Sequence, residues 1–329
     1  MDPRIRNMLG SLYPVLMGIK GARSVRMARA LPGALSYLSY RKGAKRRFGL
    51  DIDAPIGMGA VIAHALLHYA HFSREECMLY LRATSPLYSE GGRDVLAEFF
   101  ERDPWPADLA QIPASAAEYL TFWERRAHLD LAQARRLYAQ HFRPNARLRA
   151  AIEQAAEGVA RYDLSIHFRG TDKFLESGKV AHEVMLERLA PELTGLSSPN
   201  VFLATDDAGF SAAVRHAFPS ARFTSYDLGE VGDGVPRHFS QLPPSAKALE
   251  ALVNIYLIAR APVCIRTSSY LSSVSALVNP DMRTVTIDKT RSKHTPFPEF
   301  ELLEAEALRA SAGAMPVENR LNAINAGAA

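Results

Sequence analysis

The second half of this 329-residue chain alternates short apolar runs with amphipathic stretches, and this alternation constrains the fold more than any other feature. Strands are predicted at 162–168, 200–205, 221–226 and 262–267, and helices at 181–193, 208–218, 246–261 and 269–278. Strands separated by helices require right-handed crossovers, which build a parallel sheet with both faces covered. We therefore predict an α/β domain with a doubly wound parallel sheet over residues 151–290.

The first half has a different character, since helical patterns dominate residues 1–150 and strand signals are few. A helix is predicted from residue 60, followed by a short strand at 77–82. The stretch 115–142 reads as two consecutive amphipathic helices. The length fits two domains, so we predict a helix-rich N-terminal lobe, the α/β lobe and a C-terminal tail over 291–329.

Composition is that of a soluble globular protein, with 48% hydrophobic and 22% charged residues. The two cysteines, Cys77 and Cys264, form no metal or redox motif, which favours a reducing compartment. An apolar stretch at 8–20 ends at Lys20 and is shorter than the roughly 20 residues that span a bilayer. We expect a cytoplasmic protein, or one bound peripherally to the inner face of the membrane.

Residues 1–50 form a basic arm, with eleven Lys and Arg against a single acidic residue, Asp2. One interpretation is attachment to an anionic membrane surface or to an acidic acceptor, each cation contributing about 1 kcal/mol at such a surface. The other is a solvated basic helix pair with no partner. Nothing in the arm indicates nucleic-acid binding.

Three histidines, His64, His68 and His71, fall on one face of the predicted helix at spacings that suit a metal. No carboxylate or cysteine accompanies them, and a half-buried helix tolerates such histidines. We therefore assign no metal site.

Polar clusters follow three of the predicted strands: "HFRGTDK" after the first, "TDDAG" after the second and "RTSSYLSS" after the last. In open parallel sheets, ligands bind at the carboxyl ends of the strands. Thr267, Ser268 and Ser269 suit either an anion at a helix N-terminus or a simple N-cap. We interpret Asp206 or Asp207 as the N-cap of the following helix before assigning either residue a role in binding.

"HFRGTDK" is the cluster richest in chemistry. Arg169 offers a planar fork that suits a diphosphate, and Lys173 adds a point charge. Gly170 allows close backbone approach, while His167 lies one pleat before Arg169 on the same side of the strand. Asp172 can hold either cation in place. The chain has no Walker lysine signature and no strand-borne GxGxxG, which argues against a nucleotide hydrolase and a standard dehydrogenase.

Taken in order, "IHFRGTDK", "VFLATDDAGF" and "ALVNIYLIARAPVCIRTSSYLSS" resemble the core motifs of the α1,6-fucosyltransferase superfamily over about residues 160–280. A weaker resemblance lies upstream, in "IGMGAVIAHALLHYAHF" and "LRATSPLYSEGG". The resemblance implies a GT-B-like fold of two Rossmann-like lobes and a GDP-sugar donor held mainly by the second lobe. It also implies inversion at the anomeric carbon, no metal and no other cofactor.

Carried over by position, Arg169 would contact the β-phosphate and His167 the nucleotide. The other residues that the resemblance places at the donor are Gly57, Gly59, Tyr88, Asn254, Thr267, Ser268, Ser269 and Tyr270. The catalytic set comprises Arg169, Asp172, Lys173 and Glu176.

This chain departs from the family's pattern at three places. Gly170 stands where the family has a second arginine, and Asn254 where it has an aspartate that pairs with guanine. An amide cannot accept both guanine N–H donors as a carboxylate does. The family's proposed base falls at Ser177, so Glu176 is the candidate base and Asp172 the reserve.

These observations predict an inverting, metal-independent glycosyltransferase that moves fucose from GDP-fucose to a glycan or lipid-linked saccharide. The departures leave a catalytically inactive nucleotide-binding relative as one alternative. A basic membrane-surface binding protein is the other.

Overall fold

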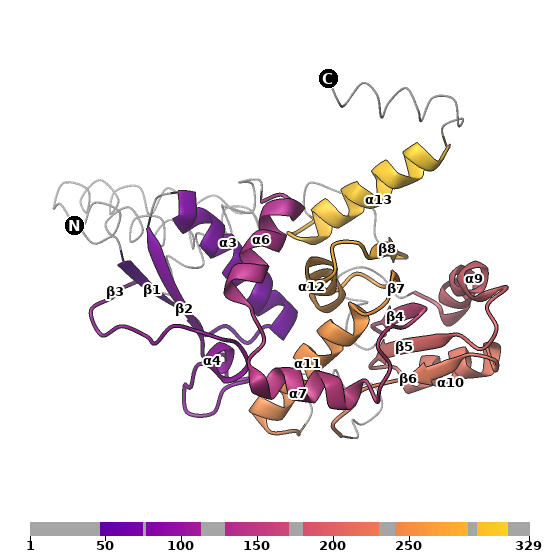
Figure 1. The fold of residues 1–329 in the computed structure, drawn as a ribbon, viewed down its shortest axis with the longest axis horizontal. Coiled ribbons are helices and arrows are strands. Elements are labelled where there is room, and N and C mark those ends of the chain that lie inside the picture. The colour runs from indigo at the N-terminus through magenta and orange to yellow at the C-terminus, as the bar shows by residue number, and fades with distance from the viewer. Residues whose placement is uncertain are drawn as a thin grey trace, which may run out of the picture. The chain divides into compact units, whose positions relative to one another are not determined.

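The computed structural model describes residues 47–74, 77–112, 129–170, 180–229, 241–288 and 295–314. The chain divides into two compact units, whose elements are coloured along the chain in Figure 1. The first comprises the chain up to Leu148 together with Pro243–Leu249, and the second Arg149–Leu242 together with the chain from Glu250 onward.

The first unit contains a three-stranded parallel sheet in the order β2-β1-β3. Its strands are β1 (Arg47–Ile52), β2 (Met78–Ala83) and β3 (Ala110–Gln111). The strand expected at 77–82 is confirmed as β2, whereas β1 was not predicted. Phe48, Leu50 and Ile52 do alternate and are buried, but they directly follow the basic run that dominates the pattern there.

Helix α3 (Met58–Arg74) joins β1 to β2 and packs on β2. Val61, Ile62 and Leu66 are completely buried, so this helix forms much of the unit's core. Among the described residues, this unit also contains α4 (Val95–Phe99) and α6 (Leu131–His141), whereas α7 (Ala146–Ala155) begins in this unit and lies mostly in the second. Of the two helices predicted in 115–142, the second is confirmed as α6, and the first lies outside the described residues.

The second unit is built on a five-stranded parallel sheet in the order β6-β5-β4-β7-β8. The strands are β4 (Leu164–Phe168), β5 (Asn200–Thr205), β6 (Arg222–Thr224), β7 (Val263–Arg266) and β8 (Arg283–Thr286). The first four were predicted, and β8 extends the sheet at one edge. All five residues of β4 are buried, as expected of a central strand covered on both faces.

The helices of this unit follow the predicted alternation. The described helices that follow β4 are α9 (His182–Leu193), α10 (Ala208–Ala217), α11 (Pro244–Ile258, mostly in this unit), α12 (Tyr270–Val278) and α13 (Glu299–Ala314). Helix α13 lies in the stretch expected to be a C-terminal tail, yet it packs on β8 and α12 with Leu302 and Leu303 buried. The stretch thus contributes to the second unit. In the part of the chain that the structure describes, no helix combines the length and apolarity that crossing a membrane requires.

Candidate functional site

The sheet of the second unit has a topological switch point beside β4. From β4 the chain adds β5 and β6 on one side, then returns to place β7 and β8 on the other. Because all neighbouring strands are parallel, their carboxyl ends share one edge, and ligands of such sheets bind at the switch point on that edge. The three polar clusters found in the sequence all begin there.

The turns after β4 and β7 hold each other by two hydrogen bonds. The Arg169 backbone N–H donates to Thr267 Oγ1 at 2.9 Å, and the Thr267 N–H donates to the His167 carbonyl at 2.9 Å. Arg169 is half-buried at the edge of the sheet. These hydrogen bonds fix the backbone of Arg169 beside the place where a ligand bound at the switch point would lie.

The acidic pair after β5 is engaged with the protein itself. Asp206 accepts the Gly170 N–H at 2.9 Å. Asp207 caps α10 by accepting the Phe210 N–H at 2.8 Å, as predicted, and lies 3.1 Å from His182 Nε2. Partial burial alone would raise the pKa of the Asp207 carboxyl, but these two contacts outweigh it and lower the pKa.

Gly170, at the position where the motif resemblance predicts a second arginine, lies in a confined position. A Cβ atom on Gly170 would be 2.5 Å from Asp207 Oδ2 and 3.0 Å from Phe168 Cε1. Since real Cβ contacts are not that short, a side chain at this position would displace the carboxylate that caps α10. The packing therefore accounts for the glycine.

The hydroxyls of the turn before α12 lie inside the protein. Thr267, Ser268 and Ser269 are at most 2% exposed. Ser269 caps α12 by accepting the Leu271 N–H at 3.4 Å, and the Ser268 N–H donates to Asp288 Oδ1 at 2.7 Å. Capping is confirmed for Ser269. Diphosphate contact by these three hydroxyls stays a prediction, and the neighbouring Tyr270 is half-buried.

A buried ion pair that the sequence did not indicate lies beneath this turn. Arg266, fully buried at the end of β7, donates to both carboxylate oxygens of Glu299 at 2.8 and 2.6 Å. Burial alone would lower the pKa of the guanidinium, but the Glu299 carboxylate outweighs it and raises the pKa. Ser272 connects this pair to His167, whose Nδ1 lies 3.0 Å from Ser272 Oγ.

Asn254, at the position where the motif resemblance predicts a guanine-binding aspartate, has a fixed amide. Its Nδ2 donates to the Tyr226 carbonyl at 3.0 Å and to the Glu250 carbonyl at 2.9 Å. Both amide donors are therefore used, which leaves Oδ1 as the atom that can accept a hydrogen bond from a base.

In the first unit, the predicted donor-contacting residues lie around the start of α3. The Tyr88 hydroxyl accepts the Met58 N–H at 3.0 Å, and Tyr88 is 3% exposed. Gly57 immediately precedes the helix, with open space where a Cβ would be, and Gly59 lies in its first turn. Contact of Gly57, Gly59 or Tyr88 with a donor stays a prediction.

Four residues of the predicted site lie outside the described residues: Asp172, Lys173, Glu176 and Ser177.

Two of the three histidines of α3 are part of the core, and His64 is half-buried. His68 and His71 are buried, and burial, with His64 and His71 nearby, lowers the pKa of His68 to about 3. No group of three His, Cys, Asp or Glu side chains suited to a metal occurs among the residues that the structure describes.

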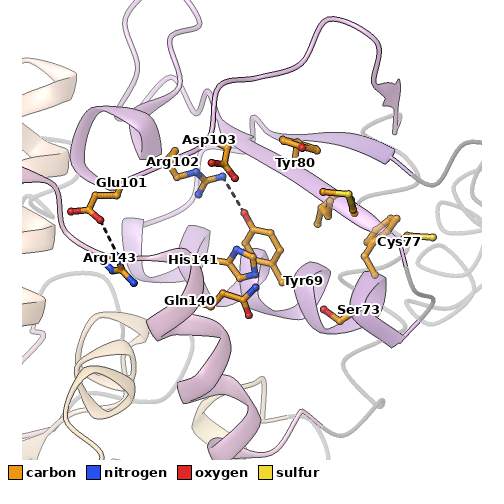
Figure 2. Close-up of a pocket in the computed structure, with 13 residues that line it drawn as sticks. Tyr69, Ser73, Cys77, Tyr80, Glu101, Arg102, Asp103, Gln140, His141 and Arg143 are labelled. Atoms are coloured by element: carbon orange, nitrogen blue, oxygen red, sulfur yellow. Dashed lines mark hydrogen bonds and ion pairs between the residues drawn. The ribbon is translucent and has the colours of Figure 1, made fainter.

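A cavity of about 560 Å³ lies in the first unit. Figure 2 shows the residues that line it. Tyr69 stacks on His141 with ring centroids 3.7 Å apart and accepts a hydrogen bond from Arg102 at 3.0 Å. Burial and the Arg102 charge lower the pKa of His141 to about 4, so the cavity presents a neutral imidazole.

This cavity is remote from Gly57 and Gly59 at the start of α3. It adjoins the last turns of that helix, about 20 Å along the helix from Gly57. Its lining comes from separated segments of the chain, which explains why no sequence motif indicated it.

Each unit is an α/β unit built on a parallel sheet, and two such units make a GT-B-like fold, as predicted. No protein-family model and no curated protein matches the chain. Among solved structures, the fucosyltransferase NodZ from Bradyrhizobium is similar, with a TM-score of 0.50 and 20% identity over 74% of this chain and 97% of that one.

Two further solved structures are more weakly similar. NodZ α-1,6-fucosyltransferase soaked with GDP-fucose gives a TM-score of 0.49 and 18% identity over 76% of this chain and 97% of that one. POFUT1 in complex with GDP gives 0.35 and 11%, covering 74% of each chain. The resemblance drawn from the motifs is thus confirmed at the level of the fold by the Bradyrhizobium enzyme.

Proposed function

We propose that this protein is a fucosyltransferase that moves fucose from GDP-fucose to a glycan or lipid-linked saccharide. The observation that carries the proposal is Arg169, fixed through Thr267 at the switch point of a fold shared with the fucosyltransferase NodZ. A nucleoside diphosphate leaving group needs positive charge and N–H donors beside its phosphates. Arg169 and the N-terminus of α12 supply both on one edge of the sheet.

In this proposal each donor contact has a distinct chemical task. Arg169 meets the β-phosphate and neutralises charge that develops as the glycosidic bond breaks. His167 contacts the nucleotide, and Asn254 Oδ1 accepts one guanine N–H. With Arg169 meeting the departing phosphate, the reaction proceeds without a metal.

Inversion at the anomeric carbon requires a base within about 3 Å of the acceptor hydroxyl. We propose Glu176 for this role and Asp172 as the alternative, both by resemblance, with Lys173 as a further cation near the phosphates. We also propose that the basic arm over residues 1–50 binds anionic lipid or the acceptor.

A catalytically inactive relative is the second candidate, favoured by Gly170 and Asn254. A second arginine cannot occupy position 170 without displacing Asp207, and the amide at 254 offers one acceptor where a carboxylate offers two. This candidate would be supported if the protein bound GDP but neither transferred fucose nor hydrolysed GDP-fucose.

The test is the Arg169→Ala variant, assayed by calorimetry with GDP and by release of GDP from GDP-fucose. We expect the rate to fall by about 10²–10³, as when one transition-state donor is removed. Arg161→Ala is the matched control, because Arg161 is exposed in the same unit and precedes the amino end of β4. A normal rate in Arg169→Ala would contradict the proposal, as would failure of the wild-type protein to bind GDP.

A further inference from the structure

The Arg266–Glu299 pair is a fixed source of hydrogen-bond donors inside the second unit. Arg266 is completely buried and Glu299 is 2% exposed. Two parallel hydrogen bonds join them, which is the geometry that best holds a guanidinium in one orientation. Arginine stays protonated, so every polar contact of this group is a donation.

Two serines of α12 lie against Arg266 Nη1. Ser273 Oγ is 2.9 Å from Nη1 and 2.5 Å from Glu299 Oε1. Its proton belongs to the carboxylate, because a charged acceptor at that distance makes the stronger hydrogen bond. Ser272 Oγ is 3.3 Å from Nη1 and shares with Ser273 Oγ, in a bifurcated hydrogen bond, the Nη1 proton that does not go to Glu299.

Ser272 then has one proton and two acceptors within reach. His167 Nδ1 lies at 3.0 Å and the Ser269 carbonyl at 3.3 Å. The carbonyl already accepts the Ser273 backbone N–H at 3.0 Å. The positive charge of the Arg266 guanidinium also repels the proton of the Ser272 hydroxyl, which therefore points away from Arg266. Distance and charge both direct the proton of Ser272 to His167 Nδ1.

We propose that Arg266, Glu299 and Ser272 are positioning residues that fix the tautomer of His167, with Nδ1 accepting from Ser272 and the ring proton on Nε2. The role rests on the proposed function, in which His167 contacts the nucleotide. An Nε2–H group is a fixed donor, which matches phosphate and carbonyl oxygens. A donor set in place before the ligand arrives costs no reorganisation on binding.

The tautomer is tested on the ligand-free protein by ¹⁵N NMR of selectively labelled histidines, with His167→Gln assigning the His167 signals among the ten histidines. We expect an unprotonated Nδ1 and a protonated Nε2 in the wild type. In Ser272→Ala, the two tautomers of His167 should interconvert. A protonated Nδ1 in the wild type, or an unchanged spectrum in Ser272→Ala, would overturn the inference.

The functional consequence is tested by the affinity for GDP. We expect Ser272→Ala to weaken GDP binding about tenfold, the equivalent of one hydrogen bond. Ser275→Ala is the matched control, since Ser275 is equally buried on α12 but donates to the Leu271 carbonyl instead. Equal affinities in the two variants would refute the positioning role.

The two experiments also separate this inference from the proposed function. Wild-type protein that shows the Nε2–H tautomer but does not bind GDP would disprove the function and the positioning role, while the hydrogen-bond arrangement stands. Wild-type protein that binds GDP with a protonated Nδ1 would disprove the inference alone.

Discussion

At the scale of single residues, Asn254 illustrates how neighbours decide which atom a ligand can meet. Its amide nitrogen is held by the carbonyls of Tyr226 and Glu250, so the side chain cannot turn a donor outward without losing two hydrogen bonds. An aspartate at this position could not make these bonds, because a carboxylate is an acceptor only. Asparagine at this position is thus part of the local packing as well as of the predicted site.

We expect Asn254→Asp to lower the free energy of unfolding by about 3 kcal/mol, because it removes two donors and places a charge against two carbonyl oxygens. Asn254→Ala loses the same bonds without adding a charge and should cost about 1–2 kcal/mol. Urea denaturation of the two variants measures the difference. An Asn254→Asp protein as stable as the wild type, with tighter GDP binding, would show that a carboxylate fits here after all.

At the scale of elements, the start of α3 depends on a side chain from another segment. The first N–H groups of a helix lack partners within the helix, and the Tyr88 hydroxyl accepts that of Met58. We expect Tyr88→Phe to cost about 1 kcal/mol of stability, measured by urea denaturation. Tyr80→Phe is the control, since the Tyr80 hydroxyl accepts a long, 3.4 Å hydrogen bond from Arg47. Unchanged stability with a loss of GDP-fucose affinity would show that Tyr88 serves the donor instead.

Elements whose apolar pattern is local were predictable from the sequence. The strand expected at 200–205 is β5 (Asn200–Thr205), and the helix expected at 208–218 is α10 with its cap at Asp207. The Arg266–Glu299 pair was not predictable, because it joins residues 33 positions apart with no periodic relation. The motifs located the edge of the sheet where the site lies, but only the fold shows which hydroxyls are buried beneath it.

At the scale of the whole molecule, the two units should respond to pH in opposite directions. In the first unit, His68 has its pKa lowered to about 3, against about 6.5 when unfolded, so the unfolded state binds more protons between these values. Stability of this unit is therefore full above pH 6.5 and falls with acidification. In the second unit, burial raises the pKa of Glu301 to about 7. Its contribution is full below about pH 4.5 and is lost as the pH rises through 7.

The experiment compares urea denaturation at pH 7 and pH 5. Trp105 belongs to the first unit, so in a Trp123→Phe background the remaining tryptophan fluorescence reports this unit, whereas far-UV circular dichroism reports both units. We expect the fluorescence transition at pH 5 to lose about 2 kcal/mol through His68, which titrates over 1.5 pH units at about 1.4 kcal/mol each, and a smaller amount through the less buried His141. His68→Leu removes the larger contribution and should leave only the weaker pH dependence that His141 gives. A fluorescence transition that does not change between pH 7 and pH 5, or one that changes equally in His68→Leu, would show that His68 is not the group responsible.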